Sequence, residues 1–178
     1  MCIRDRYTIG IDLGGTNIVA SVVDDEYKII GTSKTPTNAP RSADEIFDDI
    51  SEVCEEAVKA ANLTMADIDS VGMGTPGTVN QDGIIEFANN LAFNNVPART
   101  MLAKRLNKPE EKIYIENDAN CAALGEAYAG VGNGAKDFVA VTLGTGVGSG
   151  VIIDGKIVNG VNSVSYTHLR AHETCADL

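Results

Sequence analysis

The sequence of 178 residues contains no tryptophan, only two histidines and only four cysteines. Both histidines and two of the cysteines lie near the chain ends, at His168, His172, Cys2 and Cys175. Residues 7–163 therefore contain no histidine, which excludes a Ser-His-Asp triad, a Cys-His pair and a histidine-bearing metal site there. Cys54 falls in an apolar helical stripe and Cys121 lies among alanines, so we expect both to be buried structural thiols.

Basic residues are also scarce, because 14 lysines and arginines stand against 25 acidic residues, giving a net charge of −11 at pH 7. Duplex DNA and an anionic membrane surface are therefore not the partners that we expect for this part of the chain. No apolar run approaches the roughly 18 residues that a membrane helix needs, and the N-terminus lacks the apolar segment of a signal peptide. We expect a cytoplasmic protein with no nucleic-acid or membrane partner.

The two ends differ from the rest of the chain. Residues 1–6 show no helix or strand periodicity, and residues 164–178 break an otherwise regular pattern. Both resemble translated sequencing-adapter read-through, so we treat them as foreign sequence. Within the remainder, the glycine-rich stretch 130–136 has the composition of a connector. We expect a first lobe over residues 7–130 and the start of a second, truncated lobe over residues 131–163.

A strand, a glycine-rich turn and a second strand occur twice in the sequence. The first copy begins with YTIGID at residues 7–12, and the second begins with FVAVT at residues 138–142. Superposing Asp12 on Thr142 without a gap places Gly14 on Gly144 and Val22 on Ile152. Glycines allow backbone amides to approach an anion closely. Two such turns, one in each half, therefore predict the binding of one polyphosphate, although a single turn of this kind is equally typical of an ordinary hairpin.

Mixed α/β material lies between the two hairpins. The patterns predict strands over residues 28–35, 68–73 and 113–116, and helices over residues 42–62, 97–106 and 117–130. Ser42 and Glu45 have the spacing of a capping box at the first of these helices. Residues 79–95 have few periodic cues and predict an excursion or a small hairpin.

The better-known phosphate-binding signatures are absent. A Walker loop requires a Gly-Lys-Ser/Thr sequence, which does not occur anywhere in the chain. A dinucleotide-binding G-x-G-x-x-G fails when it starts at Gly144 or Gly146, and a strand follows these residues instead of a helix.

Five motifs together resemble a known family. The segments Asp12–Asn17 (DLGGTN) and Gly144–Gly148 (GTGVG) resemble the two phosphate motifs of the superfamily of actin, heat-shock chaperones and sugar kinases. Residues 74–77 (GTPG), 88–91 (ANNL) and 116–120 (ENDAN) are similar to motifs of the ROK family (repressor, open reading frame, kinase), above all of its bacterial glucokinases. The resemblance covers residues 7–163 and implies the actin-like ATPase, or ribonuclease H-like, fold.

The resemblance implies a role for each motif residue. The phosphates of ATP would be held by Asp12, Gly14, Gly15, Thr16, Asn17, Thr142, Gly144, Thr145, Gly146 and Gly148. The sugar would be bound by Gly77, Asn90, Asn117 and Asp118. Asp12 would also lie beside Mg²⁺, and Asp118 would be the catalytic base. The structural alternatives are a helix N-cap for Asp118 and a turn cap for Asp12.

The implied activity is ATP-dependent phosphorylation of a hexose by in-line phosphoryl transfer, with glucose, which would give glucose 6-phosphate, as the first candidate. After Ser163, members of the family continue into an Ala-Gly-Glu-x-Gly-His segment and a cysteine-rich zinc loop, which this sequence lacks. We therefore expect Zn²⁺ and a homodimer only in the full-length protein, and no activity from this piece alone.

Three alternatives stay open on the sequence alone. One is a ROK repressor that responds to a sugar and binds DNA through an upstream domain. Another is a ROK kinase acting on N-acetylmannosamine, fructose or allose. The third is an activator ATPase or a chaperone-like member of the superfamily, although such a protein has no need of the sugar motifs.

Overall fold

The computed structural model describes residues 6–143 and 147–158. The chain divides into two compact units, Met1–Glu116 and Asn117–Leu178. This boundary lies before helix α3 (Asp118–Ala129), whereas the sequence placed it at the glycine-rich stretch 130–136. The helix belongs to the second unit because it packs tightly on strand β10 (Val147–Ile153), where a Cβ added at Gly150 would lie 2.4 Å from the Cβ of Ala123.

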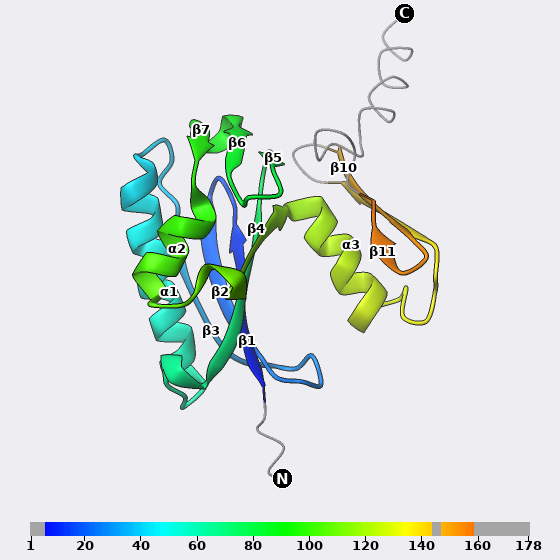
Figure 1. The fold of residues 1–178 in the computed structure, drawn as a ribbon, viewed down its shortest axis with the longest axis horizontal. Helices are drawn as coiled ribbons and strands as arrows, with labels where there is room; N and C mark the ends of the chain where they lie inside the picture. Colours follow the sequence, from blue (N-terminus) through cyan, green and yellow to red (C-terminus); the bar gives the residue numbers. More distant parts are fainter. Residues whose placement is uncertain (1–5, 144–146, 159–178) are drawn as a thin grey trace, which may run out of the picture. The chain divides into compact units, whose positions relative to one another are not determined.

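A five-stranded sheet forms the framework of the first unit, in the order β3-β2-β1-β4-β8 (Figure 1). Its strands are β1 (Tyr7–Leu13), β2 (Asn17–Val23), β3 (Ile29–Pro36), β4 (Ile68–Thr75) and β8 (Ile113–Asn117). The first three are antiparallel neighbours, and β4 then pairs with β1 in parallel. The arrows of β1, β4 and β8 point toward the same end of the sheet in Figure 1. The segments that follow these strands therefore begin at one edge.

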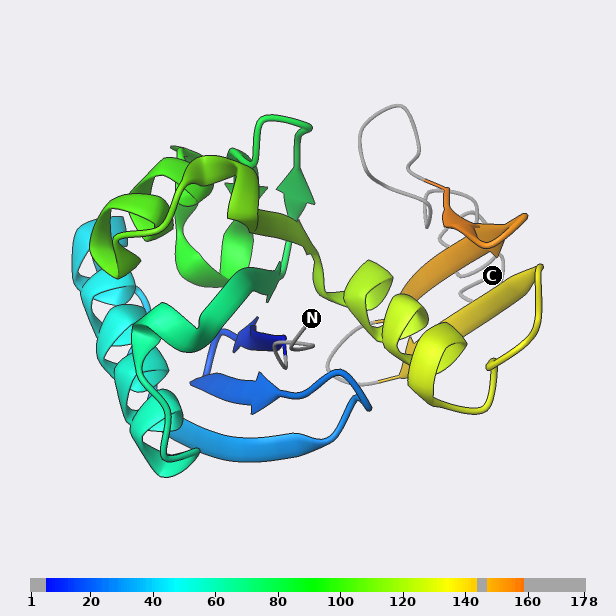
Figure 2. The same ribbon diagram turned by 60° about the horizontal axis from the view of Figure 1, so that its bottom comes forward.

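Helices α1 (Ala43–Ala60) and α2 (Ala98–Leu106) lie on the same face of this sheet (Figure 2). Alternate residues of β1 point into the core beneath them and are buried, namely Ile9, Ile11 and Leu13. The buried stripe of α1 has the spacing of one helical face and consists of Ile46, Phe47, Ile50, Val53, Cys54, Ala57 and Val58. Two short 3-10 turns, Met65–Asp67 and Glu110–Lys112, lead into β4 and β8.

The capping box that the sequence predicts is present at the start of α1. The amide of Glu45 donates to the hydroxyl of Ser42 at 3.3 Å, and the amide of Ser42 donates to the Glu45 carboxylate at 3.0 Å. The Ser42 hydroxyl also donates to that carboxylate, at 2.6 Å. The hydrogen bonds from Ser42 hold the pKa of the Glu45 carboxyl below its ordinary value, because they favour the ionised form.

The substitution Glu45→Gln is expected to reduce the loss of stability in acid. Because the folded-state pKa of Glu45 lies below its ordinary value of 4.5, the stabilisation is fully present above pH 4.5 and is lost as the pH falls through the folded-state pKa. Urea unfolding above and below pH 4.5 measures how the free energy of unfolding changes with pH in each protein. The control is Glu52→Gln on the exposed side of the same helix, and an equal change in both variants would contradict the expectation.

A second, smaller sheet completes the first unit. It consists of the antiparallel strands β5 (Thr78–Val79), β6 (Ile85–Ala88) and β7 (Phe93–Val96), with the 3-10 turn η2 (Asn89–Leu91) between the last two. The prediction of a small hairpin over residues 79–95 is therefore correct, but it did not include the third strand. Phe93 anchors this sheet to the core, since its ring centroid lies 6.4 Å from that of Phe47 on α1.

The second unit contains a three-stranded sheet in the order β11-β10-β9, with β9 (Phe138–Leu143) and β11 (Lys156–Ile157) on either side of β10. The repeated hairpin is confirmed, but its pairing differs by one residue from the gapless superposition. Asp12 pairs with Val19 in the first hairpin, whereas Thr142 pairs with Gly148 in the second. The second connection is therefore one residue shorter than the first.

Candidate functional site

The turn between β1 and β2 is the first of the two segments that the sequence predicts to bind phosphate. It closes on itself, because the amide of Gly14 donates to the carbonyl of Asn17 at 2.9 Å. Within residues 6–143 and 147–158, no acceptor takes the amides of Gly15 and Thr16. Two successive N–H groups of this kind are the donors of an anion-binding nest. The Gly14 amide is already engaged, so Gly14 contributes to the shape of the turn.

Asn90 lies directly against this turn. A Cβ added at Gly15 would be 3.3 Å from the Cβ of Asn90, which is an exposed residue of η2. The structure therefore brings a residue predicted to bind the sugar next to a turn predicted to bind phosphate. The two segments are far apart in the sequence, and Asn90 reaches the turn from the connection between β6 and β7 of the smaller sheet.

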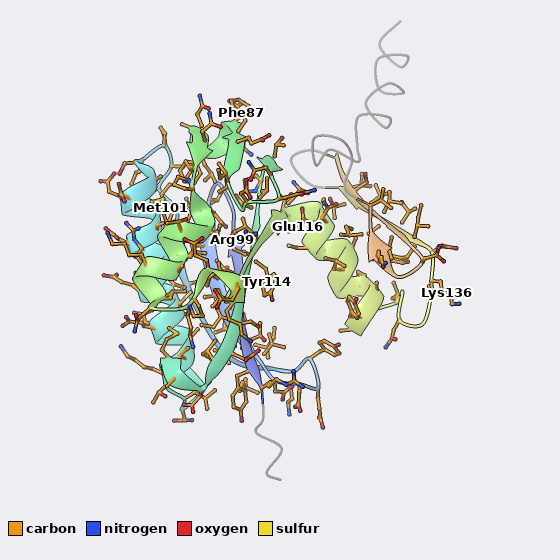
Figure 3. All side chains as sticks on the ribbon, viewed as in Figure 1. Phe87, Arg99, Met101, Tyr114, Glu116 and Lys136 are labelled. Atoms are coloured by element: carbon orange, nitrogen blue, oxygen red, sulfur yellow. The ribbon has the colours of Figure 1, made fainter. Side chains whose placement is uncertain are left out.

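Gly77 lies in the segment that follows β4, at the edge where Asp12 on β1 pairs with Gly74. Its φ is +93°, and a Cβ added there would lie 2.0 Å from the carbonyl oxygen of Phe87. Phe87 is labelled on β6 in Figure 3. The close approach of Gly77 to β6 therefore requires glycine at this position, whether or not a sugar binds there. The sugar contact of Gly77 stays a prediction.

Asn117 and Asp118 have different positions and hydrogen bonds at the start of α3. Asn117 is the N-cap, and its side chain accepts hydrogen bonds from the amides of Ala119 at 2.9 Å and Asn120 at 3.3 Å. Asp118 is the first helical residue, its side chain is exposed, and one carboxylate oxygen accepts from the amide of Ala119 at 2.8 Å. Figure 3 labels Glu116 where β8 leads into this helix. The N-cap is thus Asn117, so the structural alternative for Asp118 does not hold.

The β9–β10 hairpin meets the start of α3 within the second unit. A Cβ added at Gly148 would lie 2.5 Å from the hydroxyl oxygen of Thr142 and 3.0 Å from the Cβ of Ala119. Asp118 therefore precedes a residue that contacts the end of this hairpin. The other predicted phosphate-binding residues of the second turn, Gly144, Thr145 and Gly146, lie outside the described residues.

Asp12 fits the requirements of a magnesium ligand. It is an exposed carboxylate next to the Gly14–Asn17 turn, and Mg²⁺ in phosphate sites is usually held by one or two carboxylates together with the phosphates. No group of three or more His, Cys, Asp or Glu side chains that would hold a metal occurs in the described part of the chain. His168 and Cys175 lie outside the described residues.

The two cysteines differ from each other. Cys54 is buried, as predicted, and burial raises the pKa of its thiol to about 12. Cys121 is only half-buried, so the expectation of full burial is wrong there. The side of α3 that packs on β10 is formed by Ala119 and Ala123 instead. Across the residues that the structure describes, no helix is both long enough and apolar enough to cross a membrane.

Comparison with known proteins agrees with the motifs. The sequence model of the ROK family matches residues 8–175. The chain is 39% identical to the glucokinase of Streptomyces coelicolor, over 92% of this chain and 49% of the relative. It is 33% identical to the glucokinase of Halalkalibacterium halodurans, over 90% and 48% of the two chains. The chain thus spans about half the length of these curated relatives.

A solved structure also resembles this chain. The ROK family glucokinase of Streptomyces griseus, in complex with glucose and AMPPNP, superposes with a TM-score of 0.79 at 38% identity, over 89% of this chain and 48% of that one. A further relative has a different function: the xylose repressor of Caldicellulosiruptor bescii is 34% identical over 85% of this chain, which is 38% of the repressor.

Proposed function

Since this chain belongs to the ROK family and has the actin-like ATPase fold of that family's sugar kinases, we propose that it is part of an ATP-dependent hexose kinase. Glucose is the first candidate substrate, because the Streptomyces griseus structure is a complex with glucose and AMPPNP. The observation that carries the proposal is the contact of Asn90 with the Gly14–Asn17 turn. Phosphoryl transfer to a sugar needs the sugar and the phosphates to be held close together.

The residues of this chain supply part of what the reaction needs. Asp118 accepts the proton of the sugar hydroxyl as its oxygen attacks the γ-phosphorus, and the bond from that phosphorus to the leaving oxygen of ADP breaks. The amides of Gly15 and Thr16 bind phosphate oxygens. Asp12 would hold Mg²⁺, which would neutralise part of the phosphate charge.

A hybrid protein tests the activity directly. It joins residues 7–158 of this chain to the remaining half of the Streptomyces coelicolor glucokinase, the 39% identical relative. Coupled measurement of ADP release with glucose, fructose, allose and N-acetylmannosamine is expected to show the highest kcat/KM with glucose. A folded hybrid that hydrolyses ATP equally with and without each sugar would contradict the proposal.

A repressor is the second candidate function, and the xylose repressor at 34% identity is the observation that favours it. A repressor of this family carries a helix-turn-helix domain ahead of the kinase-like part. Genomic sequence upstream of Tyr7 distinguishes the two functions. An open reading frame that extends into such a domain, together with a hybrid that binds a sugar without phosphorylating it, would establish the repressor.

The substitution Gly15→Val is expected to raise the KM of the hybrid for both ATP and the sugar. The added side chain stands beside an amide proposed to bind phosphate and also collides with Asn90, whose Cβ would be 3.3 Å from the new Cβ. Steady-state kinetics measure both constants. The control is Gly10→Ala on β1, where an added Cβ meets nothing within 4 Å and both constants should stay the same. An increase in the KM for ATP alone would contradict the expectation that the new side chain disturbs Asn90.

A further inference from the structure

We propose that Thr37 and Arg41 are positioning residues, which orient the Gly14–Asn17 turn for binding phosphate. This inference rests on the proposed function, because it assumes that the turn binds phosphate. Neither residue belongs to a motif of the sequence analysis. Both lie in the segment between β3 and α1, and their contacts connect the turn to the core of the first unit.

Thr37 makes two hydrogen bonds to the turn. Its amide donates to the carbonyl of Thr16 at 2.8 Å, which continues the β2–β3 pairing and is possible for any residue except proline. Its hydroxyl donates to the carbonyl of Gly14 at 2.6 Å, which requires threonine or serine. The side chain is completely buried, with an exposed fraction of 0%, so the hydroxyl has no competition from bulk water.

The second hydrogen bond determines where an amide of the turn points. The carbonyl of Gly14 and the N–H of Gly15 belong to one planar trans peptide unit, in which the two groups point in opposite directions. Holding the carbonyl against Thr37 therefore directs the Gly15 N–H away from Thr37. The Gly15 amide is one of the two that no acceptor takes within residues 6–143 and 147–158. Thr37 thus fixes the direction of a donor that is proposed to bind phosphate.

Arg41 holds Thr37 in place from the other side. Its Nε and Nη2 atoms donate to the carbonyl of Thr37 at 3.0 and 2.8 Å. Nη2 also forms an ion pair with Asp49 on α1. The Arg41 side chain is only 24% exposed, and hydrogen bonds from a charged donor are stronger than those between neutral groups. The turn is therefore connected to helix α1 through Asp49, Arg41 and Thr37 in succession.

Arg105, on α2, offers a comparison, because it too binds carboxylates of α1. It is 18% exposed and binds Asp44 at 2.9 Å and Asp48 at 2.7 Å, both on α1, but it has no contact with the turn. Replacing Arg105 removes ion pairs of the same kind and tests what a loss of general stability does to the turn. Thr37→Ser keeps the hydroxyl donor and tests rescue, whereas Thr37→Val keeps the shape and removes the donor.

The first measurement is amide hydrogen exchange by NMR on the full 178-residue chain. Thr37→Val and Arg41→Met are expected to accelerate exchange of the Gly14 amide, which the closed turn protects, by roughly three- to tenfold, the effect of one hydrogen bond. Thr37→Ser and Arg105→Met should leave this rate at the wild-type value. Unchanged exchange in Thr37→Val, or equal acceleration in Arg105→Met, would overturn the proposal.

The second measurement is a titration of the same chain with magnesium tripolyphosphate, followed through the amide signal of Gly15. The dissociation constant is expected to rise in Thr37→Val and Arg41→Met by the same roughly three- to tenfold, and to stay unchanged in Thr37→Ser and Arg105→Met. A wild-type Gly15 signal that does not move would overturn the proposal even if the hybrid phosphorylates a hexose. Conversely, weakened tripolyphosphate binding in Thr37→Val supports the positioning role even if the hybrid phosphorylates no hexose. The positioning role and the kinase activity can therefore be refuted independently.

Discussion

Asp118→Asn in the hybrid protein is expected to lower kcat by about two to four orders of magnitude, with little change in the KM for the sugar. Asparagine has the same shape and still accepts the hydrogen bond from the amide of Ala119, so the start of α3 is preserved. It cannot take the proton of the sugar hydroxyl. The rate of ADP release at saturating sugar and ATP measures the change.

Two controls separate the loss of a base from damage to the helix. Asp82→Asn, in an exposed turn between β5 and β6, should leave kcat unchanged. The circular dichroism of Asp118→Asn should match that of the parent protein, because the cap of α3 is Asn117. Turnover close to that of the parent in a well-folded Asp118→Asn protein would contradict the assignment of Asp118 as the base.

Gly77→Ala is expected to reduce the free energy of unfolding of the 178-residue chain by about 2–4 kcal/mol. An alanine at this position has an unfavourable φ of +93°, and its Cβ would lie 2.0 Å from the carbonyl oxygen of Phe87. Backbone cannot move aside as a flexible side chain can, so β5 and β6 must separate. Urea denaturation followed by circular dichroism measures the loss.

The control for Gly77 is Gly134→Ala. Gly134 has a similar φ of +87°, but a Cβ added there meets nothing within 4 Å. Its substitution should cost only the conformational strain of a left-handed alanine, about 1–2 kcal/mol. Equal losses in the two variants would show that the contact with Phe87 is relieved without cost.

Most elements of the fold were predictable because their signals are local. The capping box of Ser42 and Glu45, the strand that ends at Asn117 and the helix that follows it all depend on neighbouring residues. The third strand of the smaller sheet was missed because Phe93–Val96 encloses two asparagines and is too short for an alternating pattern. The pairing of the second hairpin was missed because it depends on a turn that is one residue shorter, which a gapless superposition hides.

The candidate site was predictable only in part, for a related reason. The motifs identified Gly15 and Asn90 separately, but their contact is created by the packing of the smaller sheet and leaves no pattern in the sequence. The same holds for Thr37, since a threonine after a strand is common and its value here depends on which carbonyl it reaches. The residues proposed to bind a ligand were thus readable from motifs, and the residues proposed to orient them were not.

The strand order β3-β2-β1-β4-β8 also determines the sequence of events while the chain is being synthesised. Strands β1, β2 and β3 are joined by short turns and can pair as soon as they leave the ribosome, since closing a short loop costs little entropy. The other side of β1 pairs with β4, which begins only at Ile68, after the whole of α1. Until then the nascent protein carries β1 as an open edge strand, and an open edge strand favours aggregation and chaperone binding.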